Sequence, residues 1–281
     1  MSAPADAAYQ GTTGAFSEDA ARGMLGDHAR LQPCPTLDEV FTAVSNAHAR
    51  YAVVPIENTL AGAVPGCADL LSRHPVRIIA ERIQPIAHAL IAAPGTTLSG
   101  VRRVLSHPVA LAQCERFFAA HRDLQPVPTF DTAGAVAEVM TDGRTDTAAI
   151  ASLRAAAVHG GDILAENIQD FVGNFTRFLL LQRGEANEPL RAGLKTSVIC
   201  VLPNEPGSLL RALAPFAALE LNLSRIESRP IREAPFEYQF HLDVGPCDEA
   251  VRLEEAMTRL HARSRVVRIL GQYEPAPHPS S

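Results

Sequence analysis

The stretch FEYQFHLDV, residues 236–244, alternates apolar and polar side chains without interruption. Its apolar positions are Phe236, Tyr238, Phe240, Leu242 and Val244, and its polar positions are Glu237, Gln239, His241 and Asp243. A period of two is typical of a β-strand, whose successive side chains point to opposite faces. We expect this strand to bury its apolar face and to leave its polar face in water.

The segments around this strand complete a small α/β unit. Their order is strand TSVICVL (196–202), helix SLLRALAPFAALE (208–220), strand NLSRIESRP (222–230), the alternating strand, helix DEAVRLEEAMTRLHAR (248–263) and strand VVRILGQY (266–273). The order βαββαβ within residues 194–273 is that of the ferredoxin-like fold. The closing segment EPAPHPSS (274–281) predicts a disordered tail.

A charged, Gly- and Pro-containing segment, QRGEANEPLRAGLK (182–195), separates this unit from the preceding chain and predicts a linker. The first domain, residues 1–184, alternates short apolar runs with helical patterns. Its apolar runs include YAVVPI (51–56), VRIIA (76–80), AHALIAA (87–93), VRRVLS (101–106) and DTAAIAS (146–152). Alternating strands and helices predict an α/β fold with a mostly parallel sheet covered on both faces.

Composition excludes several classes of function. The net charge is −6, and the 25 Lys and Arg residues are scattered, which argues against a nucleic-acid partner. The five cysteines form no C-x-x-C pair, so neither a disulfide framework nor a metal site is indicated. No apolar run reaches the ~18 residues of a membrane span, and the N-terminus does not have the pattern of a signal peptide. We expect a cytoplasmic protein with no membrane partner.

Two turns of the first domain carry polar groups at strand ends. YQGTTGAFSEDAA (9–21) predicts a strand, a glycine-bearing turn and a helix start, where backbone N–H groups face an anion or an N-cap forms without a ligand. VVPIENTLAG (53–62) places Glu57, Asn58 and Thr59 where an apolar run stops. This cluster suits proton transfer, or it is an Asx-type turn.

Two further segments have the same character. In VLSHPVALAQCERFF (104–118) a strand ends at Ser106 and His107, and Pro108 is suited to the first position of a helix. GNFTRFLLL (173–181) sets Thr176 and Arg177 directly before four apolar residues that predict a buried strand.

These segments occur in the order found in the prephenate dehydratase family. The motifs in this order are GTTGAFSE, PIENT, LSHPVALAQC, AAIAS, ENIQD and NFTRF. After the linker, the pair PGSLLRAL and NLSRIESRP is similar to the regulatory ACT domain of those enzymes. The chain resembles a monofunctional prephenate dehydratase with a C-terminal ACT domain, from about Tyr9 to Tyr273. The resemblance implies a two-lobed catalytic domain similar to the type II periplasmic-binding-protein fold.

The implied reaction converts prephenate to phenylpyruvate in L-phenylalanine biosynthesis, with loss of carbon dioxide and the ring hydroxyl. Because the ring accepts the electrons of the departing carboxylate, no cofactor is needed. The catalytic threonine of the family falls on Thr176, as hydrogen-bond or proton donor to the leaving oxygen, and the polar pair falls on Glu57 and Asn58. Arg177 is a carboxylate anchor or a structural ion pair. The remaining residues expected at the substrate are Phe178, Thr59, Ser106, His107, Gly14, Ala15, Phe16 and Ser17.

The ACT resemblance implies feedback inhibition by L-phenylalanine and a homodimer or homotetramer in which a neighbouring subunit completes the effector site. The effector residues expected from it are Asn204, Pro206, Gly207, Ser208, Leu209, Asn222, Glu227, Ser228, Arg229 and Pro230.

Two departures leave alternatives open. Many relatives have glutamine at the position of Val109, so a substrate hydrogen bond from that side chain is lost. The GTTGAFSE loop is more similar to that of the arogenate dehydratases, which makes arogenate the alternative substrate. A catalytically silent amino-acid sensor is a further alternative, against which the presence of Thr176, Glu57 and Asn58 argues.

Overall fold

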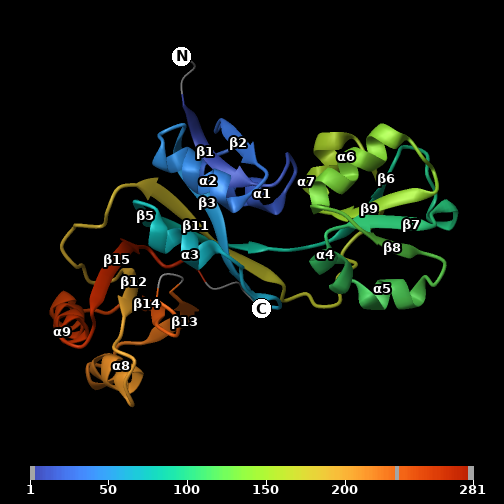
Figure 1. Ribbon diagram of the computed structural model, residues 1–281. Helices are drawn as coiled ribbons and strands as arrows, with labels where there is room; N and C mark the ends of the chain where they lie inside the picture. Colours follow the sequence, from blue (N-terminus) through green and yellow to red (C-terminus); the bar gives the residue numbers. More distant parts are fainter. Residues whose placement is uncertain (1–3, 232–233, 278–281) are drawn as a thin grey trace.

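The computed structural model describes residues 4–231 and 234–277 and contains three β-sheets (Figure 1). Two of them belong to two lobes formed by the first 183 residues, and the third belongs to a C-terminal domain that begins at Lys195. In Figure 1 the second lobe lies on the right, the first lobe in the middle and the C-terminal domain at the lower left.

The first lobe contains a sheet in the order β2-β1-β3-β11-β5, with the short β4 paired to β3. Its strands are β1 (Ala5–Gln10), β2 (Leu31–Cys34), β3 (Ala49–Asn58), β4 (Gly62–Ala63), β5 (Val76–Pro85) and β11 (Phe175–Arg183). Its helices are α1 (Phe16–Leu25), α2 (Leu37–Ser45) and α3 (Cys67–Arg73). Helix α1 packs on the face toward the second lobe, whereas α2 and α3 pack on the opposite face.

The second lobe contains a sheet in the order β10-β6-β9-β7-β8. Its strands are β6 (Ala89–Ala92), β7 (Arg103–Ser106), β8 (Gln125–Pro128), β9 (Thr147–Ala151) and β10 (Asp162–Ala165). Its helices are the 3-10 turn η1 (Leu98–Gly100), α4 (Pro108–Ala112), α5 (Glu115–Ala120), α6 (Thr132–Asp142) and α7 (Leu153–His159). Residues of α6 and α7 pack on one face of this sheet, and residues of α4 pack on the other.

The chain crosses between the lobes twice, at residues 86–88 and at residues 166–174. The two crossings are hydrogen-bonded to each other, since Ile86 N donates to Asn174 O at 2.9 Å and Ile168 N donates to His88 O at 3.1 Å. Strands β3 and β5 run toward the crossings and β11 returns from them, so β11 is antiparallel to both neighbours. The prediction of a mostly parallel sheet is therefore wrong: both sheets are mixed.

Local sequence accounts for where several helices begin. Thr36 caps α2 by accepting from Glu39 N, and Asp131 caps α6 by accepting from Gly134 N. At the start of α4 the His107 side chain accepts from Val109 N, and Pro108 occupies the first turn, as the sequence predicts.

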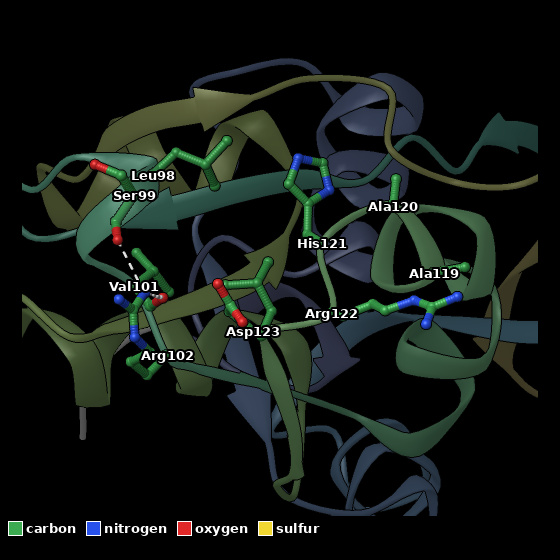
Figure 2. Close-up of a pocket in the computed structure, with 10 residues that line it drawn as sticks. Leu98, Ser99, Val101, Arg102, Ala119, Ala120, His121, Arg122 and Asp123 are labelled. Atoms are coloured by element: carbon green, nitrogen blue, oxygen red, sulfur yellow. Dashed lines mark hydrogen bonds between the residues drawn. The ribbon is translucent and has the colours of Figure 1, made fainter.

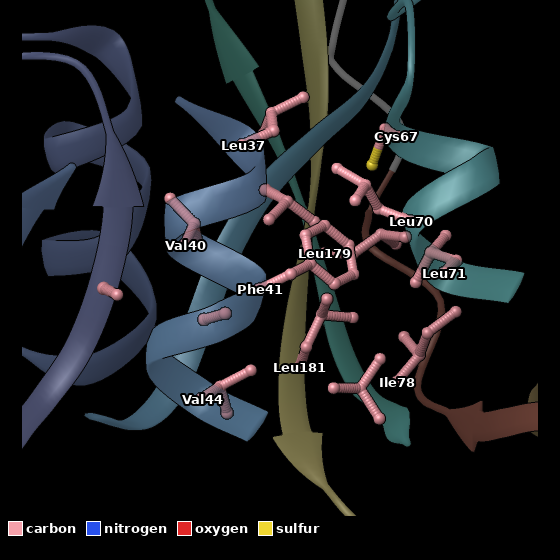
Figure 3. Packing of buried hydrophobic residues seen from close by; sticks show 14 of the residues in the cluster. Leu37, Val40, Phe41, Val44, Cys67, Leu70, Leu71, Ile78, Leu179 and Leu181 are labelled. Carbon is pink, nitrogen blue, oxygen red and sulfur yellow. The ribbon is translucent and has the colours of Figure 1, made fainter. Parts of the chain in front are cut away.

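The largest core of the first lobe extends into the C-terminal domain. Figure 3 shows Val40, Phe41 and Val44 of α2 and Leu70 and Leu71 of α3 packed over Leu179 and Leu181 of β11. The same cluster includes three residues of the C-terminal domain, Ile199, Leu270 and Tyr273. Because one apolar core is shared, the C-terminal domain is held against the first lobe by hydrophobic burial.

The C-terminal domain has the βαββαβ order that the sequence predicts. Its elements are β12 (Lys195–Val201), α8 (Ser208–Ala218), β13 (Leu223–Pro230), β14 (Tyr238–Val244), α9 (Ala250–His261) and β15 (Val266–Tyr273), in the sheet order β13-β14-β12-β15. Residues of α8 and α9 cover one face of this antiparallel sheet.

The prediction that β14 has one buried face and one solvent-exposed face is wrong. Phe240, Leu242 and Val244 pack toward the two helices, but His241 and Asp243 on the other face are also buried. That face lies against the first lobe. The alternation of residues within the strand cannot predict this contact, because the first lobe is distant in the sequence.

The docked face is also held by polar contacts. Arg268 donates to the carbonyls of Ser72, His74 and Val76 at 3.0 to 3.1 Å, and Arg229 pairs with Asp69 at 3.1 Å. Beyond β15, Ala276 N donates to Glu81 Oε1 at 2.9 Å. The last four residues of the tail predicted to be disordered, 278–281, lie outside the described residues.

His241 makes the docked face sensitive to acid. It is 1 % exposed, neither ring nitrogen has a partner among the described residues, and burial lowers its pKa from 6.5 to about 4. Arg225 and Arg229 also oppose its protonation, whereas Asp243 and Asp69 favour it. Since the folded-state pKa is the lower one, this contribution to stability is complete above pH 6.5 and is lost as the pH falls toward 4.

We therefore expect the free energy of unfolding to fall by about 3 kcal/mol through this group between about pH 7.5 and about pH 4. In His241→Phe, which cannot titrate, that part of the pH dependence should be absent. Urea unfolding of both proteins across this range measures the difference. Identical pH profiles would contradict the assignment.

Candidate active site

Thr176 and Asn58 lie side by side where β11 and β3 reach the crossings between the lobes. They are paired in the β11–β3 ladder, and Asn58 Nδ2 donates to Thr176 Oγ1 at 2.9 Å. Thr176 is 9 % exposed. The structure thus brings together two of the three residues predicted to be catalytic.

The orientation of the Asn58 amide follows from its other contacts. Asn58 Oδ1 accepts from the backbone N–H groups of Leu60 and Ala61, at 3.0 and 2.8 Å. The Nδ2 group therefore points to Thr176, where it also reaches Asn174 Oδ1 at 2.8 Å and Phe175 O at 3.0 Å. Because Thr176 Oγ1 accepts this bond, its own proton remains available to another acceptor.

Asn174 continues the network into the second lobe. Its Nδ2 donates to Gln113 Oε1 at 3.0 Å, and Gln113 Oε1 lies 2.9 Å from His88 Nε2. An amide oxygen only accepts, so His88 carries its proton on Nε2. Burial lowers the pKa of His88, which favours the neutral ring, and Nδ1 has no partner among the described residues. The network ties Thr176 to both lobes.

Gln113 was not singled out in the sequence, although a signal for it is present. It lies four residues after Val109, one turn along the helix, and Gln113 N donates to Val109 O at 3.1 Å. Residues i and i+4 share a helix face. Gln113 thus places a side-chain amide one turn after the exposed Val109, within the polar network.

Glu57 and Arg177 lie on the face of the sheet that points to the C-terminal domain, away from the Thr176 side chain. Strand β3 extends through Asn58, beyond the predicted stop at Glu57, so successive side chains there point to opposite faces. Arg177 Nη1 and Glu57 Oε1 are 2.9 Å apart. The structure does not bring either side chain to the Thr176 hydroxyl.

The Arg177 guanidinium is enclosed by acceptors. It is bonded to Glu81 at 2.6 Å, Asp243 at 2.7 Å, Glu57 at 2.9 Å and Tyr273 Oη at 3.0 Å. Burial alone would lower its pKa, but Asp243, Tyr273 and Glu81 around it raise the pKa above the usual value. Of the two roles left open by the sequence, the ion pair is the one these contacts describe.

The turn after β1 binds a carboxylate of its own chain, that of Glu18. Glu18 Oε2 accepts from Gly14 N at 2.6 Å, and Ser152 Oγ of the second lobe donates to Gly14 O at 2.8 Å. Burial alone would raise the Glu18 pKa, but the Gly14 N–H and Arg22 outweigh burial and lower it. The predicted anion position at Gly14 is thus filled by Glu18, while the Phe16 ring packs edge-on to His88 at 5.7 Å.

Ala15 is buried beside Gly14 in the core that joins the lobes, and Ser17 is half-buried in the first turn of α1. Gly14 itself has a φ of +94°, and a Cβ there would lie 2.8 Å from the Ala155 backbone. This loop therefore requires glycine where it approaches the Ala155 backbone of the second lobe.

The other predicted substrate residues have mostly structural contacts. Thr59 Oγ1 donates to Gly173 O and accepts from Phe175 N, both at 2.9 Å. Ser106 Oγ is buried and donates to Ile150 O at 2.6 Å, and His107 caps α4. Phe178 lies in the core between the lobes, 2 % exposed.

The predicted effector residues lie at opposite ends of the strands of the C-terminal sheet. In the pairing of β13 with β14, Leu223, next to Asn222, is opposite Val244 at one end, and Pro230 is opposite Tyr238 at the other. The segment before α8 lies at the Pro230 end, where Gly207 has a φ of +79° and Asn204 Nδ2 donates to Phe236 O at 3.3 Å.

The remaining effector positions follow this division. Pro206, Ser208 and Leu209 surround the start of α8, and Ser228 and Arg229 lie near the Pro230 end of β13. Glu227 pairs with Arg225, and Arg229 pairs with Asp69 of the first lobe. Asn222 is thus separated within one chain from the segment at Gly207.

The hollow in Figure 2 lies elsewhere, with a volume of about 730 Å³. It is lined by residues 98–102 and 119–124, which precede β7 and β8, whereas Ser106 lies at the other end of β7. None of the predicted site residues lines it.

Within residues 4–231 and 234–277, no group of three or more His, Cys, Asp or Glu side chains is arranged to hold a metal ion. No helix in the described part of the chain is long and apolar enough to cross a membrane.

The chain is similar to known proteins over most of its length. A family model described as "Prephenate dehydratase" matches residues 7–186. Arogenate dehydratase/prephenate dehydratase 2 of Arabidopsis thaliana is 39 % identical over 281 residues, which cover 95 % of this chain and 72 % of that protein. The bifunctional N-acyl-homoserine lactone acylase/prephenate dehydratase of Komagataeibacter europaeus is 37 % identical over 271 residues, 96 % of each chain.

Among solved structures, prephenate dehydratase from Arthrobacter aurescens in complex with L-Phe matches with a TM-score of 0.88 at 33 % identity, covering 98 % of this chain and 92 % of that one. The family model covers more than half of this chain, and the two relatives are similar over nearly all of it. The chain therefore belongs to the prephenate dehydratase family and is a dehydratase, an enzyme of the lyase class.

Proposed function

We propose that the protein converts prephenate to phenylpyruvate, with Thr176 as the donor to the leaving hydroxyl. The bond between the ring and its carboxylate breaks, carbon dioxide leaves, and the electron pair enters the ring. The carbon–oxygen bond breaks as the hydroxyl takes a proton and departs as water. Because a free hydroxyl is a weak acid, transfer from Thr176 is concerted with this cleavage, and solvent restores the proton.

One observation carries this proposal: the Thr176 hydroxyl accepts from Asn58 Nδ2 and therefore keeps its own proton for a further acceptor. No described residue accepts a hydrogen bond from Thr176 Oγ1. Asn58 is in turn held by Asn174, and Asn174 by Gln113 of the second lobe. A donor held from both lobes is oriented before the reaction, which is how enzymes lower the entropic part of a barrier.

Gln113 is the second residue that we assign to substrate. Its Oε1 already accepts from Asn174 and His88, so its NH₂ group is the part that faces other partners. We assign it as a donor to a substrate carboxylate or carbonyl. In this assignment Glu57 and Arg177 stabilise the contact with the C-terminal domain, and Phe178 packs in the core between the lobes.

The assay supplies prephenate and arogenate to the purified protein separately and follows phenylpyruvate and phenylalanine. We expect phenylpyruvate from prephenate to be the faster product. Faster turnover of arogenate would reverse the substrate assignment, and turnover of neither would end the proposal for this chain.

We further propose that the C-terminal domain is an ACT domain that binds L-phenylalanine and inhibits the enzyme. Its βαββαβ order and the L-Phe complex of the Arthrobacter aurescens relative support this. Because Asn222 and Gly207 lie at opposite ends of the strands of one sheet, a second copy placed antiparallel along the edge strand β13 would bring its Asn222 to the Gly207 segment of the first. We therefore propose a homo-oligomer, a dimer or a tetramer.

Added phenylalanine should lower turnover of the full-length protein, and Asn222→Ala should raise the concentration needed by about 10-fold, the effect of losing one or two hydrogen bonds to a charged ligand. Glu254→Ala, on the exposed side of α9, should respond like wild type. Unchanged inhibition in Asn222→Ala would contradict the site. Full-length variants are preferable to truncation, since Ile199, Leu270 and Tyr273 share the core of the first lobe.

A further inference from the structure

Outside the proposed site, a buried polar contact joins β11 to the C-terminal sheet. We propose that Arg177 is a positioning residue, through which Asp243 and Tyr273 of the C-terminal domain hold the Thr176 hydroxyl in place for catalysis. This inference rests on the proposed function. It gives the C-terminal domain a part in basal turnover, with or without an effector.

The contact is built to fix the guanidinium in one orientation. Its Nε donates to Glu81 at 2.6 Å, Nη1 donates to Asp243 at 2.7 Å and Nη2 donates to Tyr273 Oη at 3.0 Å. The side chain of Arg177 is 9 % exposed, that of Asp243 is 4 % exposed and that of Glu81 is 1 % exposed. Directed bonds on three nitrogens leave the planar group no alternative rotamer with equal bonding.

The C-terminal partners are themselves fixed. Ser197 Oγ donates to Asp243 Oδ1 at 2.6 Å and lies 2.7 Å from Tyr273 Oη. Asp243, Ser197 and Tyr273 come from β14, β12 and β15, three adjacent strands of the C-terminal sheet. On the first-lobe side, Glu81 also accepts from Lys195 Nζ of β12 at 2.6 Å. A displacement of the C-terminal sheet would therefore strain or break several buried charged bonds together.

Arg177 transmits this constraint because it is the residue next to Thr176 and lies at an irregularity of the sheet. Thr176 pairs with Asn58 and Arg177 with Glu57, but Phe178 pairs with Pro55, so Ile56 is an extra residue on β3. Such a bulge locally bends the strand and re-aims side chains. The shift pairs Glu57 with Arg177, while Thr176 on the opposite face meets Asn58.

Replacing Asp243 removes one of three carboxylates around the buried Arg177 and leaves its Nη1 bonded to Glu57 alone, which weakens the compensation of a buried charge. We expect the backbone at 176–177 to relax and the Thr176 hydroxyl to lose its fixed direction. Other contacts of the same interface do not have this effect. Arg268 donates to carbonyls of residues 71–76, and Gln239 donates to Ser72, so among the described residues neither side chain is hydrogen-bonded to β11.

The test compares full-length Asp243→Asn and Tyr273→Phe with Arg268→Gln as the matched interface control. With the substrate that the wild type turns over, Asp243→Asn should lower kcat by about 10-fold with KM changed less than about twofold. Tyr273→Phe, the milder change, should lower kcat by a smaller factor. Arg268→Gln should lower the melting temperature and leave kcat within about twofold of wild type. Equal kcat losses in all three variants would mean that the contact only stabilises the interface, as Arg268 does, and would overturn the proposal.

A double variant isolates the route through Thr176. If Asp243 acts by positioning this hydroxyl, Asp243→Asn should lower kcat by less than about twofold when Thr176 is already valine. A full 10-fold loss in that background would overturn the proposal.

Hydrogen exchange provides a readout that does not depend on activity. Backbone amides of residues 175–178 should exchange faster in Asp243→Asn and Tyr273→Phe than in wild type, and at the wild-type rate in Arg268→Gln. Unchanged exchange in the first two variants would overturn the coupling. If wild type turns over neither prephenate nor arogenate, the proposed function fails, and this exchange measurement alone decides the coupling.

Discussion

Replacing Thr176 by alanine or valine is expected to lower kcat by ~10² to 10⁴, the scale of a positioned proton donor, or about 3 to 5 kcal/mol of activation free energy. Valine is the sharper variant, because it keeps the β-branched shape that suits β11 and removes only the hydroxyl. Asn58 Nδ2 retains Asn174 Oδ1 and Phe175 O as acceptors, at 2.8 and 3.0 Å. The network therefore stays bonded, and the loss can be ascribed to the missing donor.

Thr176→Ser is the matched control, since it restores a hydroxyl at the same position with a freer rotamer. Its kcat should lie between those of wild type and Thr176→Val, with KM close to wild type. Steady-state kinetics with the preferred substrate, together with a melting curve for each variant, measures both quantities. Wild-type kcat in Thr176→Val would remove this residue from the mechanism.

Gly271→Ala is expected to separate the C-terminal sheet from the first lobe. A Cβ at Gly271 would lie 2.0 Å from Ile78 O and within 3.0 Å of two further backbone atoms of β5, so no side chain can move aside to admit it. Overpacking of this kind costs about 3 kcal/mol, which corresponds to a decrease in melting temperature on the order of 5 to 10 °C. Calorimetry or circular dichroism of the full-length variant measures it.

Gly245→Ala is the control for this substitution. It lies in the same domain, and its nearest contact would be Asn222 O at 3.4 Å, an ordinary van der Waals distance. Its melting temperature should stay within a few degrees of wild type. A Gly271→Ala protein as stable as Gly245→Ala would show that β5 and β15 do not pack as closely as described.

Local sequence was sufficient for much of the architecture. The βαββαβ order, the strand ending at Ser106 and the first-turn Pro108 are confirmed, because periodicity and helix starts depend on neighbouring residues. The family was predicted from the order of short motifs and is shown by the comparisons. The prediction of a mostly parallel sheet was wrong. The chain passes through the second lobe after β5 and returns in the opposite direction as β11, and this path is not encoded in the local pattern.

The proposed site was predicted less completely. Thr176 and Asn58 are hydrogen-bonded to each other, but Gln113, His88 and Asn174 were not named as site residues. Gln113 and Asn174 lie within the quoted motifs LSHPVALAQC and NFTRF, but these motifs do not show which of their side chains meet. These contacts become visible only when the two crossings bring distant segments together.

The sequence by itself determined the elements, their order and the motif set that includes Thr176. The tertiary structure decided which way the neighbouring charges point. Arg177 and Glu57 face the C-terminal sheet, and the polar side of β14 is buried at His241 and Asp243. The physical reason is that strand alternation is a local property, whereas strand register, the bulge at Ile56 and the docking of one sheet on another depend on contacts between residues far apart in the chain.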